Sequence, residues 1–283
     1  MTLARRVPTV EILRGDSMQV YTGMDIGTAK ATPAERSEVP HHLIDLADPG
    51  EDFDVTRWVA AARRALAAIE ARGSTAILVG GSGLYVQALV DGLEPPGRWP
   101  EIAAELEAEP DTASLHRRLS TLDPLGATRM EPTNRRRVIR ALEVTIGSGS
   151  PFSSFGPGLR RYPPGTWHLA GLWLSRPVVA ERITRRLQGM LAAGFVEEVR
   201  ALTSRDKGWS RTARQALGYR ELAAHVEQGV SLSDAVDLAD QHTRRFSIRQ
   251  RSWWRRDPRI KWFEPPQDPL ALADEILRDW LQT

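Results

Sequence analysis

The feature that most constrains this chain is an apolar segment that runs directly into an acidic, glycine-containing turn. Residues Val10–Leu13 have the character of a strand buried in a parallel sheet, and Gly-Asp-Ser-Met-Gln-Val-Tyr follows at 15–21. Asp16 therefore falls at the carboxyl end of a strand, where open α/β sheets bind their ligands. The alternative is a purely local role, because an aspartate or serine here, Asp16 or Ser17, can also cap a helix or form a turn.

Strand-like and helix-like segments alternate through the first ninety residues. After Val10–Leu13 come an alanine-rich amphipathic helix, a second buried strand and a further helix, at Val55–Arg72, Thr75–Val79 and Leu84–Val90. This alternation predicts an α/β fold with a doubly wound parallel sheet and helices on both faces.

The composition changes in the middle of the chain. Residues 93–166 are rich in proline and acidic helix formers, which predicts a mostly helical insertion with helices at Thr112–Leu122 and Thr133–Thr145. Residues 1–92 and 167–283 then form a discontinuous core. Its second part predicts a strand at Trp167–Leu174, three helices, a short strand at Ile260–Phe263 and a last helix, with the helices at Ala180–Leu202, Thr212–Glu227, Ser233–Arg255 and Pro269–Leu281.

A glycine turn, Gly80-Gly81-Ser82-Gly83, joins the second strand to the following helix. Its backbone N–H groups, with the Ser82 hydroxyl, could cradle an oxyanion at a helix N-terminus. The turn is also common as a purely structural joint. No Gly-x-x-x-x-Gly-Lys-Ser/Thr phosphate loop occurs in the sequence, and none of its three lysines, Lys30, Lys207 and Lys261, follows such a loop.

Arginines cluster although the formal net charge is only +2. They gather at 135–140 and 244–256, and Trp253-Trp254 stands among the second group. Guanidinium groups beside aromatic rings suit single-stranded nucleic acid, in which phosphates pair with the charges and bases stack on the rings. The alternative is a solvated helix face with a tryptophan in the core.

Other features exclude function classes. The chain has no cysteine, so disulfides and thiolate metal sites are excluded, and the adjacent His41 and His42 favour a structural role over metal binding. No apolar run approaches the roughly 20 residues that span a bilayer. The first residues lack the apolar core of a signal peptide, so we expect a soluble, cytoplasmic protein.

Several sequence blocks in one order make the chain resemble the tRNA dimethylallyltransferase family from Leu3 to Phe263. They are Asp16-Ser-Met-Gln-Val-Tyr, Gly23-Met-Asp-Ile-Gly-Thr-Ala-Lys, Val39-Pro-His-His-Leu-Ile-Asp, Gly80-Gly-Ser-Gly-Leu-Tyr, Arg137 with Arg140-Ala-Leu-Glu-Val, Gly218-Tyr-Arg and Arg249-Gln-Arg-Ser-Trp-Trp-Arg. The resemblance implies transfer of a dimethylallyl group from dimethylallyl diphosphate to the exocyclic amine of the adenosine 3′ of the tRNA anticodon, with Mg²⁺ as cofactor. It also implies a P-loop-type, nucleotide-binding core, and we expect a monomer.

The resemblance also implies residue roles. Asp16 would be the general base for the amine, and Ser82 the second catalytic residue. The diphosphate would lie on Gly80, Gly81, Ser82 and Gly83. The anticodon stem-loop would contact residues in four stretches: Asp16, Ser17, Met18 and Gln19; Arg136, Arg137 and Arg140; Gln215, Gly218, Tyr219 and Arg220; and Arg249, Gln250, Arg251, Trp253, Arg255 and Arg256.

The sequence departs from the family pattern in three places. Ser82 stands where the family usually has threonine, and Ala103 where we expect arginine. Moreover, Leu3-Ala-Arg-Arg resembles the end of the helix that follows the phosphate loop. We therefore expect that the first strand and the phosphate loop are missing and that the chain as printed is inactive. A P-loop-type kinase of nucleotides or small molecules and a non-catalytic RNA-binding relic are the alternatives.

Overall fold

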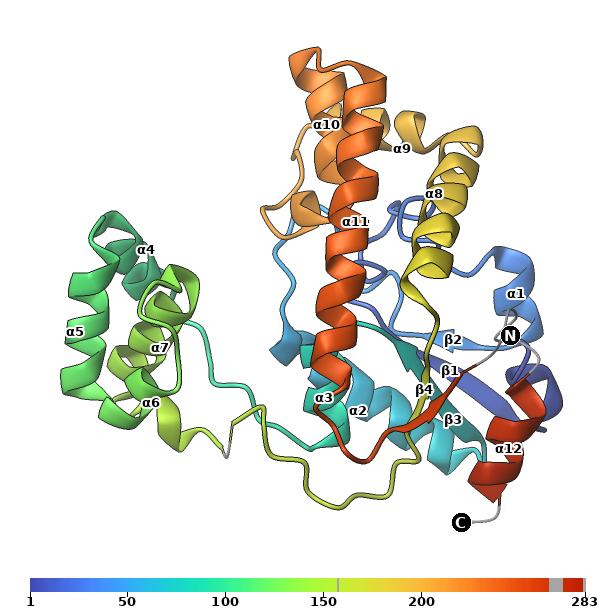
Figure 1. Ribbon diagram of the computed structural model, residues 1–283, viewed down its shortest axis with the longest axis horizontal. Helices are drawn as coiled ribbons and strands as arrows, with labels where there is room; N and C mark the ends of the chain where they lie inside the picture. The colour runs from blue at the N-terminus through green and yellow to red at the C-terminus, as the bar shows by residue number, and fades with distance from the viewer. Residues whose placement is uncertain (157, 265–271, 282–283) are drawn as a thin grey trace. The chain divides into compact units, whose positions relative to one another are not determined.

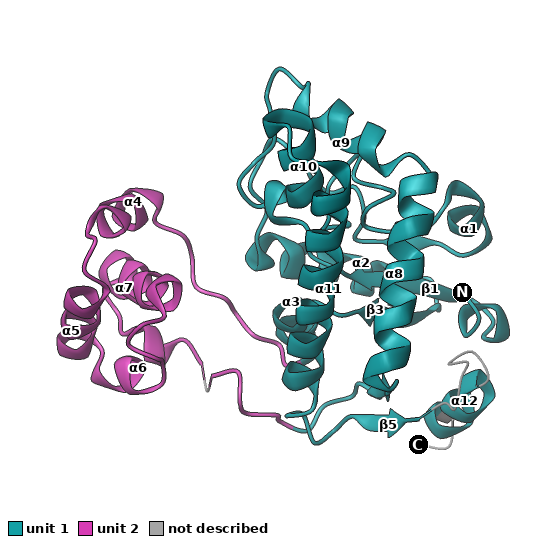
Figure 2. Ribbon diagram, turned by 45° about the horizontal axis from the view of Figure 1, so that its top comes forward, with its two compact units in different colours: residues 1–90, 164–283 teal, residues 91–163 magenta. Residues whose placement is uncertain are grey.

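The computed structural model describes residues 1–156, 158–264 and 272–281. The chain divides into two compact units (Figure 2). Unit 1 comprises residues 1–90 and 164–283, and unit 2 comprises residues 91–163. The strands of the described residues all belong to unit 1, and unit 2 is helical. Within the described ranges, no helix combines the length and the apolar character needed to cross a membrane.

A three-stranded parallel sheet forms the centre of unit 1 (Figure 1). Strand β1 (Val10–Gly15) lies between β2 (His41–His42) and β3 (Thr75–Gly80). Its register with β3 runs without interruption from Val10 beside Thr75 to Gly15 beside Gly80. Because β1 is present at residue 10 and pairs directly with both neighbours, the expectation of a missing first strand is corrected.

A second, separate sheet consists of two short parallel strands, β4 (Ala170–Leu172) and β5 (Lys261–Phe263). The fold is thus α/β with parallel strands, but the described strands do not form one continuous doubly wound sheet. Strand β4 is shorter than the segment Trp167–Leu174 that the sequence predicted. It pairs with β5 alone, and the Trp173 N–H then donates to the Phe263 carbonyl at 2.8 Å.

Local capping explains the helices that accompany the first sheet. Helix α1 (Pro33–Glu38) begins at a capping box between Thr32 and Glu35. Helix α2 (Val55–Ala71) begins at Asp54, whose carboxylate accepts the Arg57 N–H, and it packs against β1 and β3. Helix α3 (Gly83–Val90) begins on the glycine turn.

Glycines with positive φ divide two of the helices that the sequence predicted. The segment 180–202 forms α8 (Arg176–Ala192) and α9 (Phe195–Thr203), because Gly194 has φ +97°. The segment 212–227 becomes helix α10 only at Tyr219–Gln228, because Gly218 has φ +83°. Helix α11 (Leu232–Trp254) is continuous, and α12 is Ala273–Leu281. Residues 269–271 of the predicted last helix lie outside the described residues.

Unit 2 has its own apolar core. Its helices are α4 (Pro100–Ala108), α5 (Thr112–Leu122), α6 (Pro124–Thr128) and α7 (Arg135–Ser148). Leu106, Leu119 and Leu142 are almost completely buried where α4, α5 and α7 meet. Short 3-10 turns at Ala4–Arg6, Phe152–Ser154 and Ala213–Gln215 complete the described elements.

Candidate functional site

The carboxyl ends of β1 and β3 approach each other closely. A Cβ atom added to Gly80 would lie 2.1 Å from the Gly15 carbonyl oxygen, so the approach requires glycine. Just beyond the strand, the Ser82 N–H donates to the Gly15 carbonyl at 3.3 Å. The glycine turn 80–83 is therefore fixed directly against the end of β1.

The acidic turn and the glycine turn are joined by their serines. The Ser17 N–H donates to Ser82 Oγ at 3.0 Å, and Ser82 Oγ donates to Ser17 Oγ at 3.2 Å. Asp16 Oδ1 accepts the Met18 N–H at 2.8 Å, so the carboxylate does form the local turn that its position allowed. Its second oxygen, Oδ2, has no hydrogen-bond partner among the described residues, and Asp16 is partly exposed. One carboxylate oxygen is thus available beside two hydroxyl groups.

The end of helix α11 rests on the glycine turn. Gln250 Nε2 donates to the Gly81 carbonyl at 3.0 Å, and a Cβ atom on Gly83 would lie 2.6 Å from Trp253 Nε1. Gln250 and Gly81 are 169 positions apart in the sequence, so no local sequence signal could predict their contact. It brings the arginine- and tryptophan-containing segment to the turn proposed for the diphosphate.

Two tryptophans and two arginines form a surface cluster at the same end of α11. The Arg251 guanidinium lies 3.1 Å from the centroid of the Trp173 ring, and that of Arg255 lies 5.5 Å from it. Trp262 meets Trp173 edge-on at 5.3 Å. Burial lowers the pKa of Arg251, and the nearby Arg176 and Arg255 guanidinium groups lower it further. Trp173 was not among the residues singled out from the sequence.

Several residues that were predicted to contact RNA are instead buried inside unit 1, and two of them are hydrogen-bonded there. Gln19 is 2% exposed, and its amide donates to the Thr28 carbonyl at 2.9 Å. Tyr219 is completely buried and donates to Glu198, whose charge and the surrounding burial raise the tyrosine pKa. Gly218 is buried as well. Met18 and Ser17 are partly exposed, and Gln215 is exposed. Arg220 is exposed as well, but it donates to the buried Glu221 carboxylate at 2.6 Å.

Glu198 was missed by the sequence reasoning, although it organises the loop at 23–30. Its carboxylate accepts the N–H groups of Asp25, Ile26 and Gly27 at 2.9, 2.7 and 3.2 Å. In the same loop, buried Lys30 Nζ contacts Asp25 Oδ1 and Asp45 Oδ1, each at 2.6 Å. The loop at 23–30 is therefore held in place by hydrogen bonds to the Glu198 carboxylate and by the ion pairs of Lys30.

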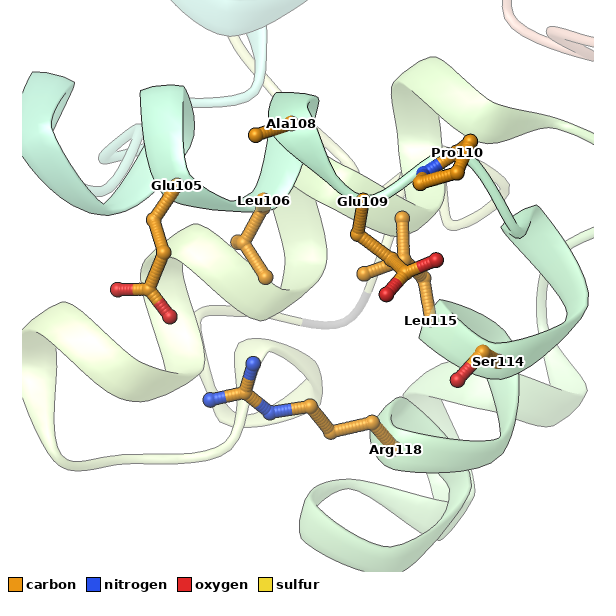
Figure 3. Close-up of a pocket in the computed structure, with 8 residues that line it drawn as sticks. All are labelled: Glu105, Leu106, Ala108, Glu109, Pro110, Ser114, Leu115 and Arg118. Atoms are coloured by element: carbon orange, nitrogen blue, oxygen red, sulfur yellow. The ribbon is translucent and has the colours of Figure 1, made fainter.

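The arginines of unit 2 differ in their surroundings. Arg140 donates to the Pro96 and Gly97 carbonyls, each at 2.8 Å, and pairs with buried Glu143 at 2.8 Å. Arg136 and Arg137 are exposed. A cavity of about 390 Å³ in this unit lies among Glu105, Glu109, Ser114 and Arg118, and no predicted site residue is among those that line it (Figure 3).

No group of three or more histidine, aspartate or glutamate side chains is positioned to hold a metal ion in the described parts of the chain. His42, one of the two adjacent histidines, instead contacts Glu11, with 2.6 Å between Nε2 and Oε2. This contact agrees with the structural role that their spacing favoured.

The fold is α/β, and the candidate site lies where the parallel strands β1 and β3 end. The family model described as IPP transferase matches residues 19–257. The chain is 44% identical over 272 residues to the tRNA dimethylallyltransferase of Kineococcus radiotolerans, and 45% identical over 270 residues to that of a Nocardioides species. Both alignments cover 94% of this chain, and they cover 85% and 86% of those proteins. The chain belongs to the tRNA dimethylallyltransferase family and is a prenyltransferase.

Solved structures agree with this assignment. The full-length tRNA isopentenylpyrophosphate transferase of Bacillus halodurans has a TM-score of 0.71 at 36% identity, with 99% of this chain and 89% of that chain covered. A eukaryotic dimethylallyltransferase acting on tRNA has a TM-score of 0.78 at 24% identity, which shows the fold alone; 99% of this chain and 73% of that chain are covered. These matches do not support the expectations that a phosphate loop is missing and that the chain is inactive. They also favour a transferase over a small-molecule kinase.

Proposed function

We propose that this chain transfers a dimethylallyl group from dimethylallyl diphosphate to the exocyclic amine of the adenosine 3′ of the anticodon in tRNA. The relatives named as tRNA dimethylallyltransferases support this substrate pair. The observation that carries the proposal is the hydrogen bond from Gln250 to Gly81. It joins the helix proposed to bind RNA to the turn proposed to bind the diphosphate.

Asp16 is the proposed general base. An aromatic amine is a poor nucleophile, so a carboxylate within hydrogen-bond reach must take its proton as the new bond forms. The amine nitrogen bonds to the allylic carbon, the carbon–oxygen bond to diphosphate breaks, and the diphosphate leaves with the electron pair. Asp16 Oδ2 is the oxygen free to receive the proton, since Oδ1 accepts the Met18 N–H.

The glycine turn and the Ser82 hydroxyl are proposed to hold the leaving diphosphate. Backbone N–H groups at a helix N-terminus, together with a hydroxyl, stabilise negative charge as it develops. A magnesium ion fits this site only as a companion of the substrate, because Mg²⁺ is commonly bound by one or two carboxylates and by phosphate oxygens. Asp16 is the carboxylate joined to the turn through the hydrogen bonds of its neighbour Ser17 with Ser82, and the ion would neutralise diphosphate charge.

The exposed arginines are proposed to contact tRNA, and they are Arg136, Arg137, Arg220, Arg249, Arg255 and Arg256. Within unit 1, Arg251 and Trp253 of α11 are proposed to join them, and Trp253 lies against Gly83 of the glycine turn. The adenine must leave its stack to reach the allyl group, and guanidinium and aromatic faces can hold the displaced nucleotides. For the buried Gln19 and Tyr219 we propose an indirect role in tRNA binding, in which they position the loops that they anchor.

Transfer is tested with labelled dimethylallyl diphosphate and an unmodified anticodon stem-loop. The wild-type chain is expected to label the stem-loop, and a stem-loop with guanosine at the target position is expected to stay unlabelled. Asp16→Asn should lower turnover by roughly 10²- to 10⁴-fold, the usual contribution of a positioned general base, while binding of the stem-loop is unchanged. Asp206→Asn, at an exposed aspartate, is the matched control.

Two results would refute this assignment. The first is absence of label on the adenosine-containing stem-loop with the wild-type chain. The second is an Asp16→Asn chain that is partly unfolded but has normal turnover in its folded fraction, because Asp16 would then only form its turn.

A further inference from the structure

Arg14 is a charged residue inside the otherwise mostly apolar strand β1. It lies beside Val79, one position before the paired glycines at the carboxyl end of the sheet. Asp16 follows two residues later, just beyond the end of the strand. Arg14 is thus at the edge where the diphosphate is proposed to bind.

The guanidinium of Arg14 is held in place by a buried amide. Arg14 Nε donates to Gln19 Oε1 at 2.8 Å, and the Gln19 amide nitrogen donates to the Thr28 carbonyl at 2.9 Å. Gln19 is almost completely buried, so this chain of contacts fixes the direction of the guanidinium. The two terminal nitrogens of Arg14 have no partner among the described residues.

Arg14 also lacks a carboxylate partner in the described structure, unlike other buried charges of unit 1. Glu11, on the same strand, pairs with Arg72, and Lys30 pairs with Asp25 and Asp45. Burial lowers the pKa of Arg14, the Asp16 carboxylate acts in the opposite direction, the Arg186 guanidinium adds to the lowering, and the Glu35 carboxylate makes the smallest contribution, a rise. A half-buried cation with a second cation nearby is unfavourable unless an anion balances their charges.

We propose that Arg14, with Arg186 of α8 as a second cation, binds the diphosphate group of the allyl substrate. The inference extends the proposed function, because it assigns the phosphate-binding charge of the same site. A planar guanidinium with two free terminal nitrogens can bind two phosphate oxygens at once.

The test measures the dissociation constant of inorganic pyrophosphate by titration calorimetry, without any turnover. Arg14→Met removes the charge and should weaken pyrophosphate binding at least tenfold, and Arg186→Met should also weaken it. Arg14→Lys keeps the charge but loses the planar fork, so an intermediate value is expected. Arg185→Met is the matched control, because Arg185 is exposed on the same helix and pairs with Glu181. The dissociation constant of pyrophosphate for Arg185→Met should stay within twofold of the wild-type value.

A parallel titration with the anticodon stem-loop separates two sources of phosphate. Unchanged stem-loop binding by Arg14→Met is expected. The inference is overturned if Arg14→Met binds pyrophosphate within twofold of the wild-type value, if it weakens only stem-loop binding, or if the wild-type chain binds no pyrophosphate. Should Arg14→Met fail to fold, Arg14→Lys and Arg186→Met decide by the same criterion. Arg14-dependent pyrophosphate binding without allyl transfer would instead refute the proposed function and leave this site intact.

Discussion

The two arginine clusters are similar in sequence but differ in what their guanidinium groups contact. In α7, Arg135 donates to the Glu107 carbonyl at 3.0 Å and Arg140 to two further carbonyls, so both arginines connect neighbouring segments of unit 2. In α11, Arg251 and Arg255 lie against the ring of Trp173, and Arg251 makes one long hydrogen bond, at 3.4 Å, to the Leu174 carbonyl. A guanidinium held by two or more carbonyl oxygens of neighbouring segments is committed to the fold. One stacked on an aromatic face keeps most of its N–H groups for a phosphate.

This contrast divides the arginines of α7. Arg135 and Arg140 serve unit 2 itself, whereas the exposed Arg136 and Arg137 resemble the arginines of α11 in their accessibility. The charge pattern of a sequence cannot separate the two kinds, because the acceptors of Arg140 are the backbone oxygens of Pro96 and Gly97, more than 40 residues away.

The largest effect on stability is expected for Arg140→Ala. The change removes two hydrogen bonds to carbonyls and leaves Glu143, which is 2% exposed, without its closest cation. Breaking a buried ion pair on one side costs about 3 kcal/mol or more of unfolding free energy. Urea unfolding monitored by circular dichroism measures this loss of unfolding free energy. Arg136→Ala, at an exposed residue of the same helix, should stay within about 0.5 kcal/mol of the wild-type value. Equal losses of unfolding free energy in Arg140→Ala and Arg136→Ala would contradict the distinction between paired and exposed arginines.

Much of the local structure could be predicted from the sequence where its signals are local. The helix predicted at Thr112–Leu122 has those bounds, and the strand at Thr75–Val79 lies within β3, because periodicity and flanking turn residues determine both. The break at Gly194 was not predicted, since a glycine in a helical pattern does not reveal a positive φ. The contacts of Gln250 with Gly81 and of Arg14 with Gln19 depend on tertiary packing. The only sequence signal for Arg14 is a charge that interrupts a buried strand, because a single arginine forms no cluster.

An intermediate effect is expected at the start of β1, where a buried carboxylate is fully paired. The hydrogen bond from Arg72 holds the pKa of Glu11 at about 2, below its ordinary value of 4.5, and contact with His42 contributes. A pKa that is lower in the folded state stabilises the fold at pH values above 4.5, and this contribution is lost as the pH falls from 4.5 toward 2. Glu11→Gln should therefore flatten the dependence of stability on pH in that interval.

The measurement is the urea midpoint at several pH values between 2 and 7. Glu70→Gln, on the exposed side of α2, is the control and should leave the acid-induced loss of stability as it is in the wild-type chain. If Glu11→Gln loses stability between pH 4.5 and 2 as steeply as the wild-type chain does, the Arg72 pairing does not control this titration.

The smallest effects are expected for the stacked arginines of α11, and they concern binding and not stability. If Arg251 and Arg255 contact tRNA phosphates, each alanine variant should lower the magnitude of the slope of log K against log salt by about one unit. Their folding stability should change little, because no carboxylate depends on them within the described residues. Arg137→Ala should lower the slope in the same way, whereas Arg185→Ala, whose guanidinium pairs with Glu181, should leave it unchanged. Binding of the anticodon stem-loop at four or more salt concentrations gives the slopes. Unchanged slopes in both α11 variants would mean that Trp173 and these arginines form a surface that does not bind RNA, and the difference between the two clusters would then concern packing alone.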